Sequence, residues 1–277
     1  MTKPVVPKEG PLGKAGFISR KKFIGLTAMG LCALPLPPLA IQTAKRSFPI
    51  KAVAFDAYAL YDTRSLVSRA ETLYPGMGTA LMSAWRTRQF EYTWLRCLSR
   101  HYADFRKVTA DALAYAIALL KLDPDMQKKA ALMQAFEDMC FVPEAEPVLR
   151  QLKSMSLQLA ILSNVTPAIL EAAIHHSGLE GVFDFVISTD SIKTYKPDPA
   201  AYQLGVDAFK VSKEEILFVA FGGWDEAGAK QFGFPTAWIN AGALPVEELD
   251  VQPDVICGNL WELLAFVKEN SPANEAE

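Results

Sequence analysis

The sequence is short of cysteine, has no strong excess of either charge and contains no long uninterrupted apolar run. Its four cysteines, Cys32, Cys97, Cys140 and Cys257, form no CxxC pair and have no histidine at metal-ligand spacing. They are too sparse for a disulfide framework or a zinc site, so we expect them to be small apolar packing residues. A net charge of -3 argues against nucleic acid as the main partner, because phosphate binding needs a basic surface. The 51% hydrophobic and 21% charged residues are typical of a globular protein with a sizeable core.

Residues 1–45 differ in composition from the rest of the chain. A polar, lysine-containing stretch ends in SRKKFI, and the apolar run from Leu26 to Ala40 that follows is broken by three prolines, so it is too short for a membrane span. A basic segment before a short apolar one is typical of a secretory signal. SRKKFI resembles the twin-arginine export signal, with Lys21 in place of the second arginine. We therefore predict export to the periplasm without stable membrane insertion; a cytoplasmic leader and an uncleaved membrane anchor are the alternatives.

From residue 46 onward, short apolar runs alternate with segments of helical periodicity. The first run, Lys51–Phe55, leads directly into Asp56. Apolar strands that alternate with helices are typical of a parallel sheet covered on both faces, and right-handed crossovers make it a doubly wound, Rossmann-like α/β fold. We assign residues 46–60 and 144–270 to this core and 271–277 to a disordered tail. The later apolar runs are Leu157–Leu162, Phe185–Ser188, Ile216–Ala220, Thr236–Ile239 and Val255–Cys257, and helical segments between them include Pro167–Ser177 and Pro199–Phe209.

A long stretch with almost no strand signal separates the first two predicted strands. Apolar residues at helical spacing occur there in Gly78–His101, Thr109–Lys121 and Asp125–Phe141. A connection of this length needs structure of its own. We predict an inserted helical cap over residues 61–143. It would lie above the carboxyl ends of the strands, where open α/β sheets bind their ligands.

Polar side chains follow several of the predicted strands. Asp56 comes after the first, Ser163-Asn164 after the second, and Lys196 and Asp225 lie beyond later strands, in YKPDP and GGWDEAG. A carboxylate beside a fixed ammonium stays ionised and is available as a nucleophile at neutral pH. The alternative role is a helix N-cap or a turn for Asp56, and a helix N-cap for Ser163-Asn164 and for Asp225. For Lys196 it is a solvated surface position.

In this order, Phe55-Asp56-Ala57-Tyr58, LSN-x-[ST]-P, YKPDP and WDEAGAKQFGFPTAWIN resemble the haloacid dehalogenase superfamily. Two segments of the predicted cap, Ala84-Trp85-Arg86 and QFEYTWLRCL, resemble the type II L-2-haloacid dehalogenases more narrowly. The resemblance runs from about Ile50 to Ile239. Tyr58 stands where phosphatases of this superfamily have a second aspartate, so a carboxylate ligand for a hard cation is missing. The resemblance therefore implies no metal, no other cofactor and no phosphoryl transfer.

By this resemblance the chain is expected to be a hydrolase that acts on the carbon–halide bond of a small 2-halo carboxylic acid. Asp56 would displace halide from C2 of an L-2-haloacid, and water would then attack the carbonyl of the Asp56 ester to give a D-2-hydroxy acid. Arg86 would assist the departing halide, and Lys196 and Asp225 would orient the nucleophile and the water. The resemblance also implies a homodimer. Substrate contacts would come from Ala57, Tyr58, Phe105, Ser163, Asn164, Tyr202 and Trp224.

Two segments depart from the family's pattern. The family has Asp-x-Tyr-Gly-Thr-Leu-[Phe/Tyr]-Asp, whereas DAYALYD, from Asp56 to Asp62, is one residue shorter and has no threonine. Before Trp224 the family has Ser-Ser-Asn-Ala, and this chain has Ala220-Phe221-Gly222-Gly223. Losing one well-placed polar group from a transition-state site costs about 3 kcal/mol. The alternatives are therefore a related hydrolase with an altered substrate and a non-catalytic protein that binds a small carboxylate.

Overall fold

The computed structural model describes residues 49–271, so the predicted leader and residues 272–277 of the predicted tail lie outside the described residues. Within that range, six strands form a single parallel sheet in the order β3-β2-β1-β4-β5-β6. The predicted strands are confirmed to within one residue at their ends. They are β1 (Ala52–Phe55), β2 (Gln158–Ser163), β3 (Phe185–Ser188), β4 (Ile216–Ala220), β5 (Thr236–Ile239) and β6 (Val255–Cys257).

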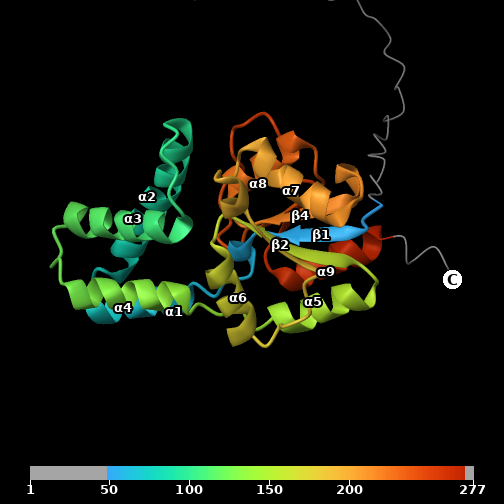
Figure 1. Cartoon of the computed structure of the whole chain (residues 1–277). Helices are drawn as coiled ribbons and strands as arrows, with labels where there is room; N and C mark the ends of the chain where they lie inside the picture. The colour runs from blue at the N-terminus through green and yellow to red at the C-terminus, as the bar shows by residue number, and fades with distance from the viewer. Residues whose placement is uncertain (1–48, 272–277) are drawn as a thin grey trace, which may run out of the picture. The chain divides into compact units, whose positions relative to one another are not determined.

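Helices cover both faces of this sheet. Alternate residues of β1 enter two separate cores, with Val53 and Phe55 in one and Ala52 and Ala54 in the other. This is the doubly wound arrangement that the apolar runs predict. Figure 1 shows α7 and α8 on one face and α5, α6 and α9 on the other. Their bounds are α5 (Ala145–Ser154), α6 (Pro167–His176), α7 (Pro199–Phe209), α8 (Gly223–Phe232) and α9 (Leu260–Asn270), and the short 3-10 helices are η1 (Ala57–Ala59), η2 (Thr189–Ile192) and η3 (Lys213–Glu215).

Four helices are inserted between β1 and α5: α1 (Arg64–Leu73), α2 (Gly78–Leu98), α3 (Phe105–Leu119) and α4 (Met126–Glu137). The carboxylate of Asp104 accepts a hydrogen bond from the first turn of α3, and that of Asp125 accepts two from the first turn of α4, which fixes where both helices begin. An antiparallel bridge between Tyr61 and Phe141 joins the two ends of the insertion. In Figure 1, β1 points toward the side on which α1 to α4 lie.

The sequence segments with helical spacing correspond to α2, α3 and α4, but α1 is absent from that prediction. Its apolar residues do lie on one side of the helix, where Leu66 and Ala70 are buried, so the spacing signal was present and was overlooked. No helix in the described part of the chain is long and apolar enough to cross a membrane.

The cysteines do not all pack as expected. Cys257 is buried and Cys97 is partly buried, but Cys140 is exposed, so the prediction is wrong for Cys140. The reason is local, because Cys140 lies in the segment between the end of α4 and the Tyr61–Phe141 bridge and not within a packed element. Cys32 lies outside the described residues.

Candidate active site

Strand β1 places Asp56 at the carboxyl edge of the sheet. Its backbone N–H donates to the carbonyl of Val219 at 2.9 Å, which continues the pairing with β4. Its carboxylate Oδ2 accepts from the N–H of Tyr58 at 3.1 Å, so Asp56 caps η1. The other oxygen, Oδ1, accepts from Lys196 Nζ at 2.9 Å and from Ser163 Oγ at 3.4 Å. Asp56 therefore both caps a helix and forms an ion pair, two roles that the sequence analysis treated as alternatives.

Lys196 lies between two buried carboxylates. Its side chain is 1% exposed, and Nζ lies 2.9 Å from Asp56 and 2.5 Å from Asp225, so a solvated surface position is excluded. Burial alone would lower the pKa of Lys196, but the two carboxylates raise it above its ordinary value. Burial raises the pKa of Asp225 to about 6, despite the attraction of Lys196. One ammonium for two carboxylates leaves the group with a net negative charge when all three are ionised.

Tyr202 completes this buried network from α7. Its hydroxyl donates to Asp225 Oδ1 at 2.8 Å, and its side chain is fully buried. Helix α8 can pack closely against Tyr202 and Pro197 because residue 228 is glycine. A Cβ at Gly228 would lie 2.6 Å from both the Tyr202 hydroxyl and Pro197. Asp225 lies in the first turn of α8, whose N-cap is Gly222, so the capping alternative for Asp225 is wrong.

Ser163 is the last residue of β2, and Asn164 follows the strand directly. Asn164 Oδ1 accepts from the N–H of Lys196 at 2.8 Å and from Thr189 Oγ1 at 3.2 Å, which ties the Lys196 loop to the sheet. Its amide nitrogen Nδ2 is buried and has no hydrogen-bond partner within the described residues. The N-cap of α6 is Thr166, so the capping alternative for Ser163-Asn164 is also wrong. An unpaired buried donor is unfavourable by about 1–3 kcal/mol, so it marks a place where a ligand acceptor would bind favourably.

Arg86 comes from the inserted α2 and lies against aromatic rings. Its guanidinium carbon is 4.7 Å from the ring centre of Tyr58, 4.5 Å from that of Phe221 and 5.8 Å from that of Phe90. Within residues 49–271, no carboxylate forms an ion pair with it. Burial lowers the pKa of Arg86, an effect that Tyr58 and Asp56 oppose. Arg86 is thus a partly buried cation whose guanidinium N–H groups donate no hydrogen bond within the described residues.

A second contact joins the Asp56 loop to the insertion through Gln89. The Tyr58 hydroxyl donates to Gln89 Oε1 at 3.1 Å, and Gln89 Nε2 donates to Thr109 Oγ1 at 2.6 Å. All three side chains are buried. Sequence reasoning included Gln89 only as part of a family-like segment. Its position three residues after Arg86, on the same face of a helix, was the available signal.

Of the residues described above, Asp56, Tyr58, Arg86, Phe90, Phe221 and Gly222 line a cavity of about 290 Å³. The ring of Trp224 packs 5.1 Å from Phe90 and 5.3 Å from Trp94, centre to centre. A Cβ at Gly222 would lie 2.8 Å from the indole nitrogen of Trp224, so the indole occupies the space of a side chain at that position. Phe90, Phe221 and Glu247 were not identified from the sequence as lining residues. The lining residues are Asp56, Tyr58, Ser83, Arg86, Thr87, Phe90, Phe221, Gly222, Gly223, Trp224, Leu244 and Glu247.

Phe105 does not line this cavity. It is fully buried at the start of α3, where its ring packs against Phe136 and Tyr195. Its carbonyl accepts from the Thr109 hydroxyl, the group that holds Gln89. Phe105 therefore does not contact the cavity but helps to hold Thr109, and through it Gln89, in place. Of the other predicted substrate contacts, Tyr58 and Trp224 line the cavity. Ser163 bonds to Asp56, which lines it, whereas Tyr202 bonds to Asp225, which does not.

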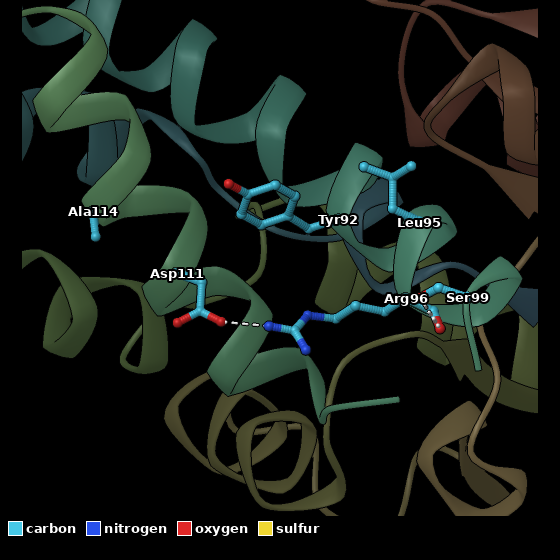
Figure 2. Close-up of a pocket in the computed structure, with 6 residues that line it drawn as sticks. All are labelled: Tyr92, Leu95, Arg96, Ser99, Asp111 and Ala114. Atoms are coloured by element: carbon cyan, nitrogen blue, oxygen red, sulfur yellow. Dashed lines mark hydrogen bonds and ion pairs between the residues drawn. The ribbon is translucent and has the colours of Figure 1, made fainter. Parts of the chain in front are cut away.

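A larger hollow, of about 520 Å³, lies between α2 and α3 and contains none of the predicted site residues (Figure 2). The two charged groups that line it, Arg96 and Asp111, pair with each other at 2.7 Å, and Lys107 also pairs with Asp111. Within residues 49–271, no group of three or more His, Cys, Asp or Glu side chains could hold a metal ion. The lining residues are Tyr92, Leu95, Arg96, Ser99, Asp111 and Ala114.

Comparison with known proteins assigns the family. The family of haloacid dehalogenase-like hydrolases matches residues 50–233. An (S)-2-haloacid dehalogenase of Pseudomonas sp. (strain YL) is 41% identical over 78% of this chain and 91% of its own length. The chain belongs to the type II L-2-haloacid dehalogenase family. The superfamily and family named from the sequence motifs are thereby confirmed.

Two further members of the dehalogenase family are similar to this chain. Haloacetate dehalogenase H-2 of Moraxella sp. (strain B) is 43% identical over 74% of this chain and 92% of its own length. The structure of L-2-haloacid dehalogenase from Xanthobacter autotrophicus is 37% identical, with a TM-score of 0.72 over 79% of this chain and 98% of that one. A second structure of that enzyme, with a TM-score of 0.71, has chloropropionic acid covalently bound. The predicted α/β fold with a helical insertion is confirmed by these structures.

Proposed function

We propose that this chain is a hydrolytic dehalogenase that converts an L-2-haloacid to a D-2-hydroxy acid and halide through an ester on Asp56. One observation carries the proposal: a carboxylate held by Lys196 lines the same cavity as Arg86, a cation that has no carboxylate partner among residues 49–271. That arrangement suits a reaction in which a carboxylate attacks and an anion leaves. The covalently bound chloropropionic acid in the Xanthobacter autotrophicus relative supports the same chemistry.

In the first step, a carboxylate oxygen of Asp56 bonds to C2 of the haloacid. The C2–halogen bond breaks and its electron pair leaves with the halide. Asp56 Oδ2 accepts one hydrogen bond and Oδ1 accepts two, so Oδ2 keeps more free lone-pair capacity and is the attacking atom. Lys196 holds the Asp56 carboxylate in place through an ion pair of 2.9 Å, and the positive charge of Arg86 stabilises the departing halide.

The substrate carboxylate would bind at the Asn164 side of the site. Asn164 Nδ2 is a buried donor without a partner in the described part of the chain, and a carboxylate oxygen would satisfy it. Ser163, which bonds to Asp56, and the backbone N–H of Ala57, at the start of η1, would complete the proposed binding site. The cavity of about 290 Å³ is near the small end of ligand sites and suits a short acid.

In the second step, water attacks the carbonyl carbon of the Asp56 ester, and the bond between that carbon and the hydroxy-acid oxygen breaks. Asp225, fixed by Lys196 and Tyr202, would accept the water proton and pass a proton to the departing hydroxy-acid oxygen. Its pKa of about 6 makes it a base at neutral pH that is stronger than an ordinary aspartate. We also propose that residues 61–143 act as a cap that excludes bulk water during both steps.

A related hydrolase with a different substrate is the second candidate. It is favoured by the Trp224 indole, which takes the place of the side chain expected at position 222 and reshapes the cavity wall. A purely binding protein is less consistent with the site, because it has no need of the buried Asp56–Lys196–Asp225 network.

The proposal is tested by incubating the full-length chain with excess L-2-chloropropionate in H₂¹⁸O. Chloride release and ¹⁸O in the Asp56 peptide after repeated turnovers are expected, because water enters at the ester carbonyl. Asp56→Asn should release no chloride, since an amide oxygen is a poor nucleophile. Absence of chloride, label and adduct from the wild type would overturn the proposal for this substrate.

We further propose that residues 1–45 direct export to the periplasm and that the protein is a homodimer. The SRKKFI segment supports the first proposal. Exposed apolar side chains on α2 and α3 support the second: Leu95 and Leu119 are each 55% exposed and Leu98 is 83% exposed. Cell fractionation of the full-length chain tests export. Sedimentation of Leu98→Glu tests the dimer, which that substitution should dissociate.

A further inference from the structure

We propose that Phe221 is a positioning residue for Arg86. Together with Tyr58 it would hold the guanidinium at the cavity wall by aromatic contact and leave its N–H groups for the departing halide. Phe221 stands where the family's pattern has serine. This inference rests on the proposed dehalogenase function and assigns the halide side of that site.

The Arg86 guanidinium packs against two aromatic rings, those of Tyr58 and Phe221. The ring centres of Tyr58 and Phe221 are 6.4 Å apart, and the guanidinium carbon lies 4.7 Å from the first and 4.5 Å from the second. Both distances fall within the range of about 6 Å in which a cation is attracted to an aromatic face. The two ring planes are tilted by 45°, and both rings line the cavity that Arg86 shares with Asp56.

Phe221 is held rigidly enough to act in this way. It follows Ala220, the last residue of the buried strand β4. Its carbonyl accepts a hydrogen bond from the indole of Trp238 at 2.9 Å, and Trp238 is itself buried in β5. The ring therefore projects from a fixed strand end, and Arg86 on α2 packs against it across the interface between insertion and sheet.

Aromatic rings can stabilise the buried Arg86 cation without using its N–H donors, which a carboxylate partner could not do. Burial destabilises the charged form of Arg86, which is why its pKa is lowered. A carboxylate would offset that effect but would use the N–H donors and neutralise the charge that the halide needs. Ring faces stabilise the cation without accepting its hydrogen bonds, and all five N–H donors of the guanidinium stay available.

The proposal predicts a specific dependence on the leaving group. When the C2–halogen bond breaks, its electron pair moves to the halogen, and chloride needs more stabilisation than iodide. Phe221→Leu keeps an apolar side chain but removes the aromatic face. We expect kcat for L-2-chloropropionate to fall about tenfold, whereas kcat for L-2-iodopropionate falls less than about threefold. KM should change little for either substrate.

Three variants test whether Phe221 acts through Arg86. Phe221→Tyr keeps the ring and should restore kcat to within about twofold of the wild type. Phe221→Leu should have almost no further effect when combined with Arg86→Met, because its target is already absent. Phe90→Leu is the matched control: its ring is farther from the guanidinium, at 5.8 Å, so the chloro-to-iodo ratio should change less. Phe221→Met serves in place of the leucine variant if that variant does not fold.

Bromide binding to the substrate-free, full-length protein separates this inference from the proposed function. Bromide should quench Trp224, which lines the cavity, and the apparent Kd should rise about tenfold in Phe221→Leu but not in Phe221→Tyr. If the wild type releases no halide but this pattern holds, the proposed function fails and the positioning role stands. Equal losses for both halopropionates, or no dependence of bromide binding on the ring at position 221, would overturn the role of Phe221.

Discussion

The two sides of the cavity stabilise charge in opposite ways. On the sheet side, Asp56, Lys196 and Asp225 are almost fully buried and joined by hydrogen bonds, so each charge has a partner within the protein. On the inserted side, Arg86 packs against aromatic rings and has no carboxylate partner within the described residues. The nucleophile Asp56 is therefore fixed by ion pairing within the protein. Arg86, the cation proposed to contact the leaving group, keeps its charge available for the ligand.

The largest expected effect comes from removing the cation on the sheet side. Lys196→Met leaves Asp56 and Asp225 buried beside each other without an ammonium. We expect the free energy of unfolding to fall by about 3–5 kcal/mol, because breaking a buried pair leaves an uncompensated charge. Urea denaturation measures this. Lys107→Met is the control: its pair with Asp111 is exposed, so a change below about 1 kcal/mol is expected. Similar losses in both variants would contradict the pairing argument.

Removing the cation on the inserted side should separate activity from stability. Arg86→Met deletes a desolvated charge that has no carboxylate partner in residues 49–271, so we expect the free energy of unfolding to stay within about 1 kcal/mol of the wild type. Halide release from L-2-chloropropionate should fall about a hundredfold or more, because the charge that develops on the halide is no longer stabilised. Paired denaturation and chloride assays test both parts. Strong destabilisation of this variant would show that Arg86 contributes to stability much as Lys196 does, which would contradict the comparison between the two sides.

Asp225 predicts how the sheet side responds to pH. Burial raises its pKa to about 6, above the ordinary 3.8. Between these values the folded chain holds a proton that the unfolded chain has lost. This group therefore favours folding at the acid end of that window, and the contribution disappears as pH rises through about 6. The proposed water step needs the ionised form, so kcat should fall about tenfold from pH 7 to pH 5.

The pH effect should appear in the second step and not in the first. Rapid quenching at pH 5 should show the Asp56 ester accumulating, because displacement of halide uses Asp56 and Arg86 while Asp225 is needed only for hydrolysis. A fall in kcat at pH 5 without accumulation of the ester would place the titrating group elsewhere.

The sequence predicts the sheet side of the site better than the inserted side. Apolar strands that end in Asp56 and Ser163 indicate a shared sheet edge, so the meeting of these groups with Lys196 and Asp225 follows from the topology. The roles of Phe221 and Gln89 were not predictable in this way. They depend on how α2 packs on the sheet edge, a tertiary contact between residues far apart in the chain. Phe105 illustrates the same limit, because an apolar ring at a helix start suits a cavity wall and a buried core equally well.

The smallest predicted effect lies where the two sides touch. Tyr58→Phe removes the hydroxyl that donates to Gln89 but keeps the ring against Arg86. We expect the free energy of unfolding to fall by about 1 kcal/mol, because the buried Gln89 oxygen loses its donor. The ratio of chloro to iodo turnover should stay within about twofold of the wild type, because the aromatic face remains. Tyr58→Leu, which removes ring and hydroxyl together, should change that ratio as Phe221→Leu does. If Tyr58→Phe alone changed the ratio, the hydroxyl and not the ring would position Arg86, and the contrast between charge pairing on the sheet side and aromatic contact on the inserted side would fail.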